Sequence, residues 1–149
     1  MSVESKLENS PEMERDIRDI LAGAKTIAVV GISPKEDRPS HKVAKYLIEH
    51  GFEVIGVNPG SERILGAKCY PDLKSIPERV DVVDIFRSAD AIPGIVDEAI
   101  EIGAGAVWMQ LGLEDEESAQ KARRAGVKVV MNRCTKIEHS RILGVSSQG

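Results

Sequence analysis

The chain has 149 residues, of which 42% are hydrophobic and 30% are charged, and its formal net charge at pH 7 is -4. This length suits one domain with a full hydrophobic core, and the acidic balance argues against a general nucleic-acid binder, which usually has a basic face. No apolar run approaches the roughly 20 residues that span a bilayer, so no membrane partner is expected. The polar N-terminus has no signal-peptide core, which favours a cytoplasmic location with Cys69 and Cys134 as free thiols.

The first third of the chain predicts a tail, a helix, a strand and a second helix. Residues 1–11 are polar and lack an apolar period, so a flexible tail is expected there. A polar cap before Pro11 begins a helix that runs to about Leu21. The continuous apolar run Thr26–Val30 predicts a strand buried on both faces. After a polar loop, residues 41–50 have helical spacing and end at a glycine.

The rest of the chain continues this alternation of strands and helices. Strands are expected at 53–57, 80–86, 105–109 and 127–131, and helices at 91–102 and 114–125. Residues 61–79 look irregular, with a helical turn or two near 71–76. A short helical turn at 137–143 and a tail at 144–149 close the chain, which leaves one domain over 12–143.

Such spacing of strands and helices is typical of βαβ units. The expected fold class is therefore α/β: a Rossmann-like, three-layer open parallel sheet of about five strands with helices on both faces. The expected strand order is 3-2-1-4-5. Ligands of such sheets bind at the carboxyl ends of the strands, beside the point where the order reverses. Here that point lies next to the first strand.

The loop after the first strand has features of a phosphate site. Gly31 allows close approach of the backbone to a ligand, and Ile32 and Ser33 follow directly. The helix that begins near Ser40 directs free N–H groups to the same edge of the sheet. Possible cationic partners are Lys35, Arg38 and His41. The alternative is a tight turn with solvated charges.

This loop does not match the common nucleotide fingerprints. Of the pattern G-x-G-x-x-G only the first glycine, Gly31, is present, and no G-K-[ST] motif occurs. The second strand ends in Asn58 and Pro59, where a dinucleotide site would have an acidic residue for the ribose. Both departures count against an NAD(P)-dependent enzyme. An enzyme that depends on NAD(P) or another nucleotide stays an alternative.

The other strand ends supply further candidates. Val57, Asn58 and Pro59 could border an adenine, and Phe86 could pack on a base. Arg87 could pair with a phosphate, and Gln110 could hydrogen-bond an amide. Cys134 is expected at the same edge. For each of these residues, a plain packing, turn or surface role is the alternative.

Six short segments in order carry a resemblance to a known family. They are V-V-G-I-S-P (29–34), R-P-S-H-K-V-A-K-Y-L (38–47), G-V-N-P (56–59), D-I-F-R (84–87), V-W-M-Q-L-G (107–112) and N-R-C-T-K-I-E-H (132–139). With these segments the chain resembles the small bacterial and archaeal CoA-binding proteins. Their fold is similar to the N-terminal domain of the succinyl-CoA synthetase alpha subunit.

The resemblance implies a role in coenzyme A binding for most of the candidate residues. Gly31, Ile32 and Ser33 would bind the diphosphate, and Arg38 would neutralise it. The adenosine would lie against Val57, Asn58 and Pro59, the nucleotide groove would include Phe86 and Arg87, and Gln110 would face the pantetheine arm. Gly60 stands where such proteins often have a basic residue for the ribose phosphate. Arg63 and Lys35 are the candidates to replace it.

A complete catalytic set is not evident in the sequence. Cys134 and His139 could form a dyad, but no third residue orients them, and a structural hydrogen bond is the favoured role of His139. The scattered Cys and His residues lack the spacing of a zinc site. The expected function is binding of CoA or acyl-CoA as a carrier, sensor or partner subunit, with a mixed disulfide at Cys134 as a further hypothesis. A structural subunit without a ligand is the other alternative, and a homodimer is a candidate assembly.

Overall fold

A computed structural model describes residues 10–148 of the chain. Its strands are β1 (Thr26–Val30), β2 (Glu53–Val57), β3 (Arg63–Ile64), β4 (Ala67–Tyr70), β5 (Val82–Ile85), β6 (Ala106–Met109) and β7 (Lys128–Val130). Its helices are α2 (Pro11–Gly23), α3 (Pro39–Glu49), α4 (Ile92–Glu101), α5 (Glu116–Arg124) and α6 (Thr135–Gln148). Short 3-10 turns are η1 (Leu73–Ser75) and η2 (Ala89–Ala91).

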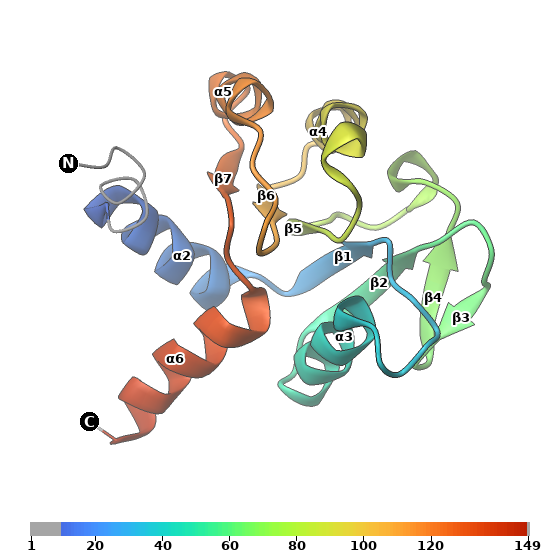
Figure 1. Ribbon diagram of the computed structural model, residues 1–149, viewed down its shortest axis with the longest axis horizontal. Helices are drawn as coiled ribbons and strands as arrows, with labels where there is room; N and C mark the ends of the chain where they lie inside the picture. Colours follow the sequence, from blue (N-terminus) through green and yellow to red (C-terminus); the bar gives the residue numbers. More distant parts are fainter. Residues whose placement is uncertain (1–9, 149) are drawn as a thin grey trace.

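The strands form one seven-stranded sheet in the order β3-β4-β2-β1-β5-β6-β7. All neighbours pair in parallel except β3, which pairs antiparallel with β4. Helices α4 and α5 cover one face, and α2, α3 and α6 cover the other (Figure 1). This arrangement confirms the expected α/β, Rossmann-like, three-layer class.

The buried strand β1 shows why the sequence folds into three layers. All five of its residues are buried. Ala28 and Val30 pack into the core beneath α4 and α5, whereas Ile27 and Val29 pack into the core beneath α2 and α3. An unbroken apolar run is stable in a strand only when both faces of the sheet are covered.

The predicted strand count and the place of the third predicted strand need correction. The five predicted strands are all present within two residues of their expected bounds, but the segment 61–79 adds the hairpin β3–β4. The predicted strand 80–86 is β5, which pairs with β1 and not with β2. The place beside β2 belongs to β4. The five predicted strands therefore stand in the order 2-1-3-4-5. When β4 is counted as the third strand, the parallel strands follow the order 3-2-1-4-5-6.

The hairpin escaped prediction because its turn has an unusual sequence. Leu65 and Gly66 both have positive φ, 55° and 79°, as in a two-residue type I′ turn. Asn or Asp usually fills the first of these positions, because leucine rarely adopts positive φ. The strands are also short, with two and four residues.

Several helix ends also differ from expectation: α2 ends at Gly23, two residues late, and α5 begins at Glu116, also two residues late. Helix α3 begins two residues early because Pro39 occupies its first position, where a proline costs no hydrogen bond. The predicted turn at 137–143 belongs to α6, which includes most of the predicted tail 144–149. Of the predicted tail 1–11, residues 1–9 lie outside the described residues. Ser10 caps α2, and its Oγ accepts a hydrogen bond from the Met13 amide at 3.0 Å.

Helix α6 is held against both α2 and α3, which places its first residues at the carboxyl edge of the sheet. Arg141 donates to the carboxylates of Glu14 on α2, at 3.0 Å, and Glu138, at 2.8 Å. Tyr46 of α3 shares a hydrogen bond of 2.8 Å with Nδ1 of His139. These contacts fix Cys134 and the start of α6 beside the ends of β1 and β6.

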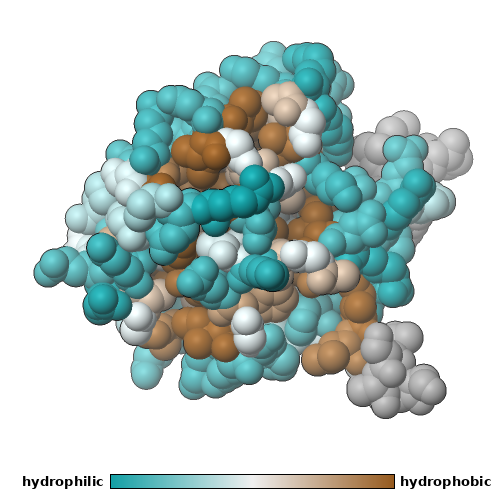
Figure 2. Space-filling view, turned by 180° about the vertical axis from the view of Figure 1, so that it is seen from behind, coloured by the Kyte–Doolittle hydropathy of each residue, from teal (hydrophilic) through white to brown (hydrophobic). Residues whose placement is uncertain are grey.

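The surface is mostly polar. Figure 2 shows one face of the molecule, on which hydrophilic residues surround smaller hydrophobic areas. Large exposed hydrophobic side chains include Leu111 and Ile137. Among residues 10–148 no helix combines the length and the apolar character that a bilayer span requires.

Candidate functional site

A pocket of about 620 Å³ opens at the carboxyl edge of the sheet, over the ends of β1, β5 and β6. After β1 the chain builds the sheet on one side, with β2 and β4, and then returns to the other side of β1 with β5, β6 and β7. The pocket therefore lies at the point where the strand order reverses. The lining residues are Gly31, Ser33, Lys35, Arg38, Pro39, Ser40, Val43, Phe86, Arg87, Gln110, Leu111, Leu113 and Cys134. The pocket therefore forms where open α/β sheets bind their ligands.

Gly31 is required by the close approach of two loops at the pocket floor. Its φ is +91°, a conformation that side chains disfavour. A Cβ atom here would lie 2.6 Å from the carbonyl oxygen of Phe86 and 2.9 Å from Cδ of Arg87. The Gly31 amide donates to the carbonyl of Val57 at 3.0 Å. The glycine thus lets the ends of β1, β2 and β5 meet.

Ser33 joins the loop after β1 to the first turn of α3. Its amide donates to Oγ of Ser40 at 3.0 Å, and its own Oγ accepts from the Lys35 amide at 3.1 Å. His41 donates from Nδ1 to the Ser33 carbonyl at 2.9 Å. Two of the amides expected to face a phosphate, those of Gly31 and Ser33, are therefore already hydrogen-bonded within the protein.

The pocket is positive although the whole chain carries a net charge of -4. Lys35, Arg38 and Arg87 line it, and its lining includes no Asp or Glu. Within residues 10–148, none of these three side chains has an acidic partner within 4.0 Å. The positive charge of Arg87 also acts on the exposed Asp90, whose pKa is lowered by a hydrogen bond from Ser88 and by this charge. Cations gathered in a cleft attract anions, so the pocket suits a ligand with several negative charges.

A fully buried carboxyl group lies beneath the pocket. Asp84 of β5 has 0% exposure, and burial raises its pKa to about 7, although hydrogen bonds from Gln110 and Thr135 act in the opposite direction. Nε2 of Gln110 donates to Oδ1 of Asp84 at 2.6 Å and to Oγ1 of Thr135 at 3.2 Å. The Thr135 hydroxyl donates to the other carboxyl oxygen at 2.9 Å. The three side chains form one buried hydrogen-bonded group.

Cys134 lines the pocket but is only 9% exposed. Burial raises the pKa of its thiol, so the reactive thiolate is disfavoured at neutral pH. Cys69 is also buried, in β4, and neither cysteine forms a disulfide. Only Cys134 of the two faces the pocket.

His139 has a structural partner and not a catalytic one. Its Nδ1 is bonded to the Tyr46 hydroxyl, and its ring packs edge-on against Phe52 and His50. Burial and the nearby His50 lower the pKa of His139. No hydrogen bond joins it to Cys134 within the part of the chain that the structure describes, so the arrangement offers no Cys–His dyad.

The structure brings together nine of the fourteen candidate binding residues. They are Gly31, Ser33, Lys35, Arg38, Ser40, Phe86, Arg87, Gln110 and Cys134. Five others, Ile32, His41, Val57, Asn58 and Pro59, do not line the pocket. Ile32 and Val57 are in the core, and Asn58 donates to the Ile32 carbonyl at 2.8 Å and accepts from the Gly60 amide at 2.7 Å.

The sequence did not identify every residue of the pocket and its base. Val43, Leu111 and Leu113 contribute apolar walls, and no spacing rule distinguishes them from core residues. Asp84 had a detectable signal, because an acidic residue within the apolar run of β5 is rarely buried without a function or a partner. No sequence pattern marked Thr135, because its role depends on the packing of α6.

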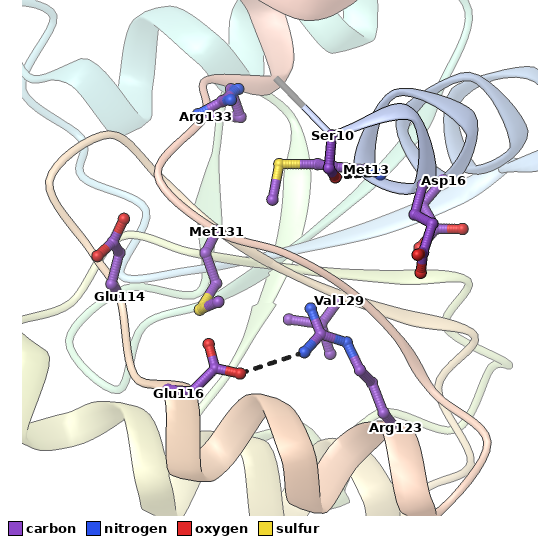
Figure 3. Close-up of a pocket in the computed structure, with 10 residues that line it drawn as sticks. Ser10, Met13, Asp16, Glu114, Glu116, Arg123, Val129, Met131 and Arg133 are labelled. Carbon is purple, nitrogen blue, oxygen red and sulfur yellow. Dashed lines mark hydrogen bonds and ion pairs between the residues drawn. The ribbon is translucent and has the colours of Figure 1, made fainter. Parts of the chain in front are cut away.

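A second pocket, of about 530 Å³, lies between the starts of α2 and α5 and the edge strand β7 (Figure 3). Its floor includes Met13 and Met131, and its rim carries four carboxylates and two arginines. Arg123 and Glu116 form an ion pair at 3.5 Å. The excess of carboxylates makes this pocket unsuitable for a polyanion. No group of three or more potential metal ligands occurs in residues 10–148.

Known proteins match this chain over most of its length. A family described as a CoA binding domain matches residues 25–140. The YneT protein of Bacillus subtilis is 40% identical over 125 residues, which are 84% of this chain and 93% of that protein. The ADP-forming acetate–CoA ligase I of Archaeoglobus fulgidus is 35% identical over 122 residues, which are 74% of this chain but 18% of the ligase. A solved structure from Pyrococcus horikoshii OT3 has a TM-score of 0.84 and 46% identity, with 88% of this chain and 92% of that chain covered.

Proposed function

Because the chain belongs to the CoA binding domain family, we propose that it binds coenzyme A or an acyl-CoA in the pocket over β1, β5 and β6. The family membership confirms the resemblance inferred from the sequence. The observation that carries the proposal is the charge of the pocket. Three cations and no Asp or Glu line a cavity of about 620 Å³ in an acidic protein, and CoA is a polyanion with a long, mostly uncharged arm.

In this proposal the diphosphate lies beside Arg38, Arg87 and the first turn of α3. Guanidinium groups pair with phosphate oxygens through two parallel hydrogen bonds. The Ser33 and Ser40 hydroxyls lie on the same wall. Side chains supply most of the contacts, because the amides of Gly31 and Ser33 already have partners.

The adenosine leaves the pocket toward the turn after β2, where Pro59 is exposed. The pantetheine arm runs the other way, past Phe86 to Gln110 and Cys134. Arg63 donates to the Gly66 carbonyl at 3.1 Å within the hairpin. Lys35, which lines the pocket, is therefore the better candidate for the 3′-phosphate that Gly60 cannot bind.

The proposed role is that of a binding module, as a carrier, sensor or partner subunit. The chain spans 18% of the matched acetate–CoA ligase, and ligase activity is a property of that larger protein. The best nucleophile in the pocket, Cys134, has a raised thiol pKa and no histidine partner in the described residues. Binding without catalysis is what this set of side chains supports.

Thermal unfolding with CoA, acetyl-CoA, NAD, NADP and ATP tests the proposal. At a free ligand concentration of 100 times Kd, binding adds about 2.7 kcal/mol to the free energy of unfolding, which raises the Tm of a domain this size by roughly 5–10 °C. We expect this shift with CoA or acetyl-CoA and a smaller one with NAD and NADP. A shift only with NAD or NADP, or none with any ligand, would reject the proposal.

Arginine variants locate the site. Arg38→Ala and Arg87→Ala should each weaken CoA binding about tenfold, since charge-assisted hydrogen bonds contribute roughly 1.5–3 kcal/mol each. Arg15→Ala is the matched control, because Arg15 is exposed on α2, away from the pocket. Equal effects of all three substitutions would indicate nonspecific attraction of CoA and not this pocket.

A further inference from the structure

The hydrogen bonds beneath the pocket determine which atom of Gln110 faces a ligand. Gln110 follows β6, lines the pocket and is 6% exposed. Its side-chain nitrogen donates to both Asp84 and Thr135, at 2.6 Å and 3.2 Å. Both of these partners have 0% exposure and lie below the pocket floor. The nitrogen of the amide is therefore directed into the protein.

The opposite orientation of the amide is unfavourable. An ionised carboxylate only accepts hydrogen bonds, so an amide oxygen placed 2.6 Å from Oδ1 of ionised Asp84 would be repelled. When Asp84 is protonated, the Thr135 hydroxyl still gives its only proton to Asp84, so its oxygen accepts from the Gln110 nitrogen and would repel an amide oxygen. The Thr135 hydroxyl already donates to Oδ2 of Asp84 at 2.9 Å. This bond fixes the carboxylate and leaves Oδ1 to the amide of Gln110.

The oxygen of the same amide is available to a ligand. No donor among residues 10–148 bonds it, and no fully buried side-chain nitrogen or oxygen in that range lacks a partner. The oxygen must then reach the open space of the pocket. The same pocket is lined by the apolar side chains of Leu111 and Leu113.

We propose that Asp84 and Thr135 are positioning residues that present Gln110 as a hydrogen-bond acceptor, and that this acceptor binds an amide N–H of the pantetheine arm. The inference rests on the proposed function. The arm of CoA contains two secondary amides, whose N–H groups are donors, whereas ADP lacks this arm. The pocket thus distinguishes CoA from a plain adenine nucleotide by a donor in the arm and not by phosphate charge alone.

The test compares the Kd values for CoA and ADP, measured by isothermal titration calorimetry on the wild-type protein and its variants. Gln110→Met keeps the length of the side chain and removes the acceptor. We expect CoA binding to weaken about tenfold and ADP binding to change less than twofold. Asp84→Leu removes the acceptor for the Gln110 nitrogen, and a similar loss specific to CoA is expected.

Two further variants separate positioning from a general structural role. Asp84→Asn can still present an oxygen to Gln110, so it should recover most of the CoA affinity that Asp84→Leu loses. The double variant of Asp84→Leu and Gln110→Met should bind CoA no more weakly than Gln110→Met alone, because Asp84 acts through Gln110. If Asp84→Leu does not fold, Asp84→Asn and Gln110→Met decide the question.

The results that overturn this inference differ from those that reject the proposed function. A wild-type protein that binds neither CoA nor ADP rejects the function itself. Wild-type binding of CoA with an unchanged ratio of CoA to ADP affinity in Gln110→Met overturns the inference alone. A CoA-specific loss in Asp84→Asn as large as that in Gln110→Met also overturns it, since the charge of Asp84 would then matter and not its hydrogen bond.

Discussion

Replacing Asp84 by asparagine should change how the stability of the protein depends on pH. Burial gives this carboxyl a pKa of about 7 in the folded protein, against an ordinary value of 3.8. Between these two values the folded state holds a proton that the unfolded state has lost. The free energy of unfolding therefore falls as pH rises from about 4 to 7. Asparagine, which is neutral at every pH, removes this dependence.

The magnitude follows from the two pKa values. Each pH unit in this window changes the free energy of unfolding by up to about 1.4 kcal/mol, which amounts to about 4 kcal/mol over the whole window. Asp84→Asn should therefore gain stability relative to the wild type as pH rises, and the difference should level off above pH 7. His139 contributes an opposite slope below its ordinary pKa of 6.5, because its pKa is lowered in the folded state. The difference between the unfolding free energies of Asp84→Asn and the wild type does not contain the contribution of His139, because both proteins have it.

Urea unfolding at intervals between pH 4.5 and 8 measures this difference. The matched control is Asp19→Asn, which removes an exposed carboxylate on α2 and should differ from the wild type by about 0.5 kcal/mol or less at every pH. A difference between Asp84→Asn and the wild type that stays constant from pH 4.5 to 7.5, or shrinks as pH rises, would refute the argument from burial.

Two other predictions concern the pocket itself. Gly31→Ala should destabilise the protein by about 3 kcal/mol or more in urea unfolding, because a positive φ costs roughly 1–2 kcal/mol and the new Cβ would also meet the Phe86 carbonyl at 2.6 Å. Gly126 has φ +85° and open space around it, so Gly126→Ala should lower the free energy of unfolding only by the roughly 1–2 kcal/mol that the positive φ costs. Equal losses of stability in the two variants would contradict this explanation. Oxidised CoA should form a mixed disulfide at Cys134: its thiolate bonds to one sulfur of the CoA disulfide and reduced CoA leaves. Because burial raises the thiol pKa, intact-mass spectrometry should show faster adduct formation at pH 9 than at pH 7. The adduct should still form in Cys69→Ser and should be absent in Cys134→Ser. An adduct that persists in Cys134→Ser would exclude Cys134 as its site.

Local sequence patterns were sufficient for the elements that surround the loop after β1. The run Thr26–Val30 is apolar without interruption, which only a strand covered on both faces tolerates. Gly31 marks the sharp turn after it, and Pro39 marks the start of α3. Each of these signals acts within a few residues, through φ preferences or burial. They were enough to predict the fold class and the edge of the sheet where the pocket lies.

The tertiary structure alone decided which strands are neighbours and which side chains meet. β5 lies beside β1, and β4 lies beside β2. These neighbours depend on crossover connections that include whole helices and on a hairpin whose turn, at Leu65, has an unusual residue for its positive φ. Asp84 and Thr135 are 51 residues apart in the chain, yet they share a hydrogen bond because β5 and the start of α6 pack together. Asn58 looked like a ligand contact, but its amide holds the Ile32 carbonyl. Hydrogen bonds of this kind join distant segments, and no pattern within a single segment encodes the partner.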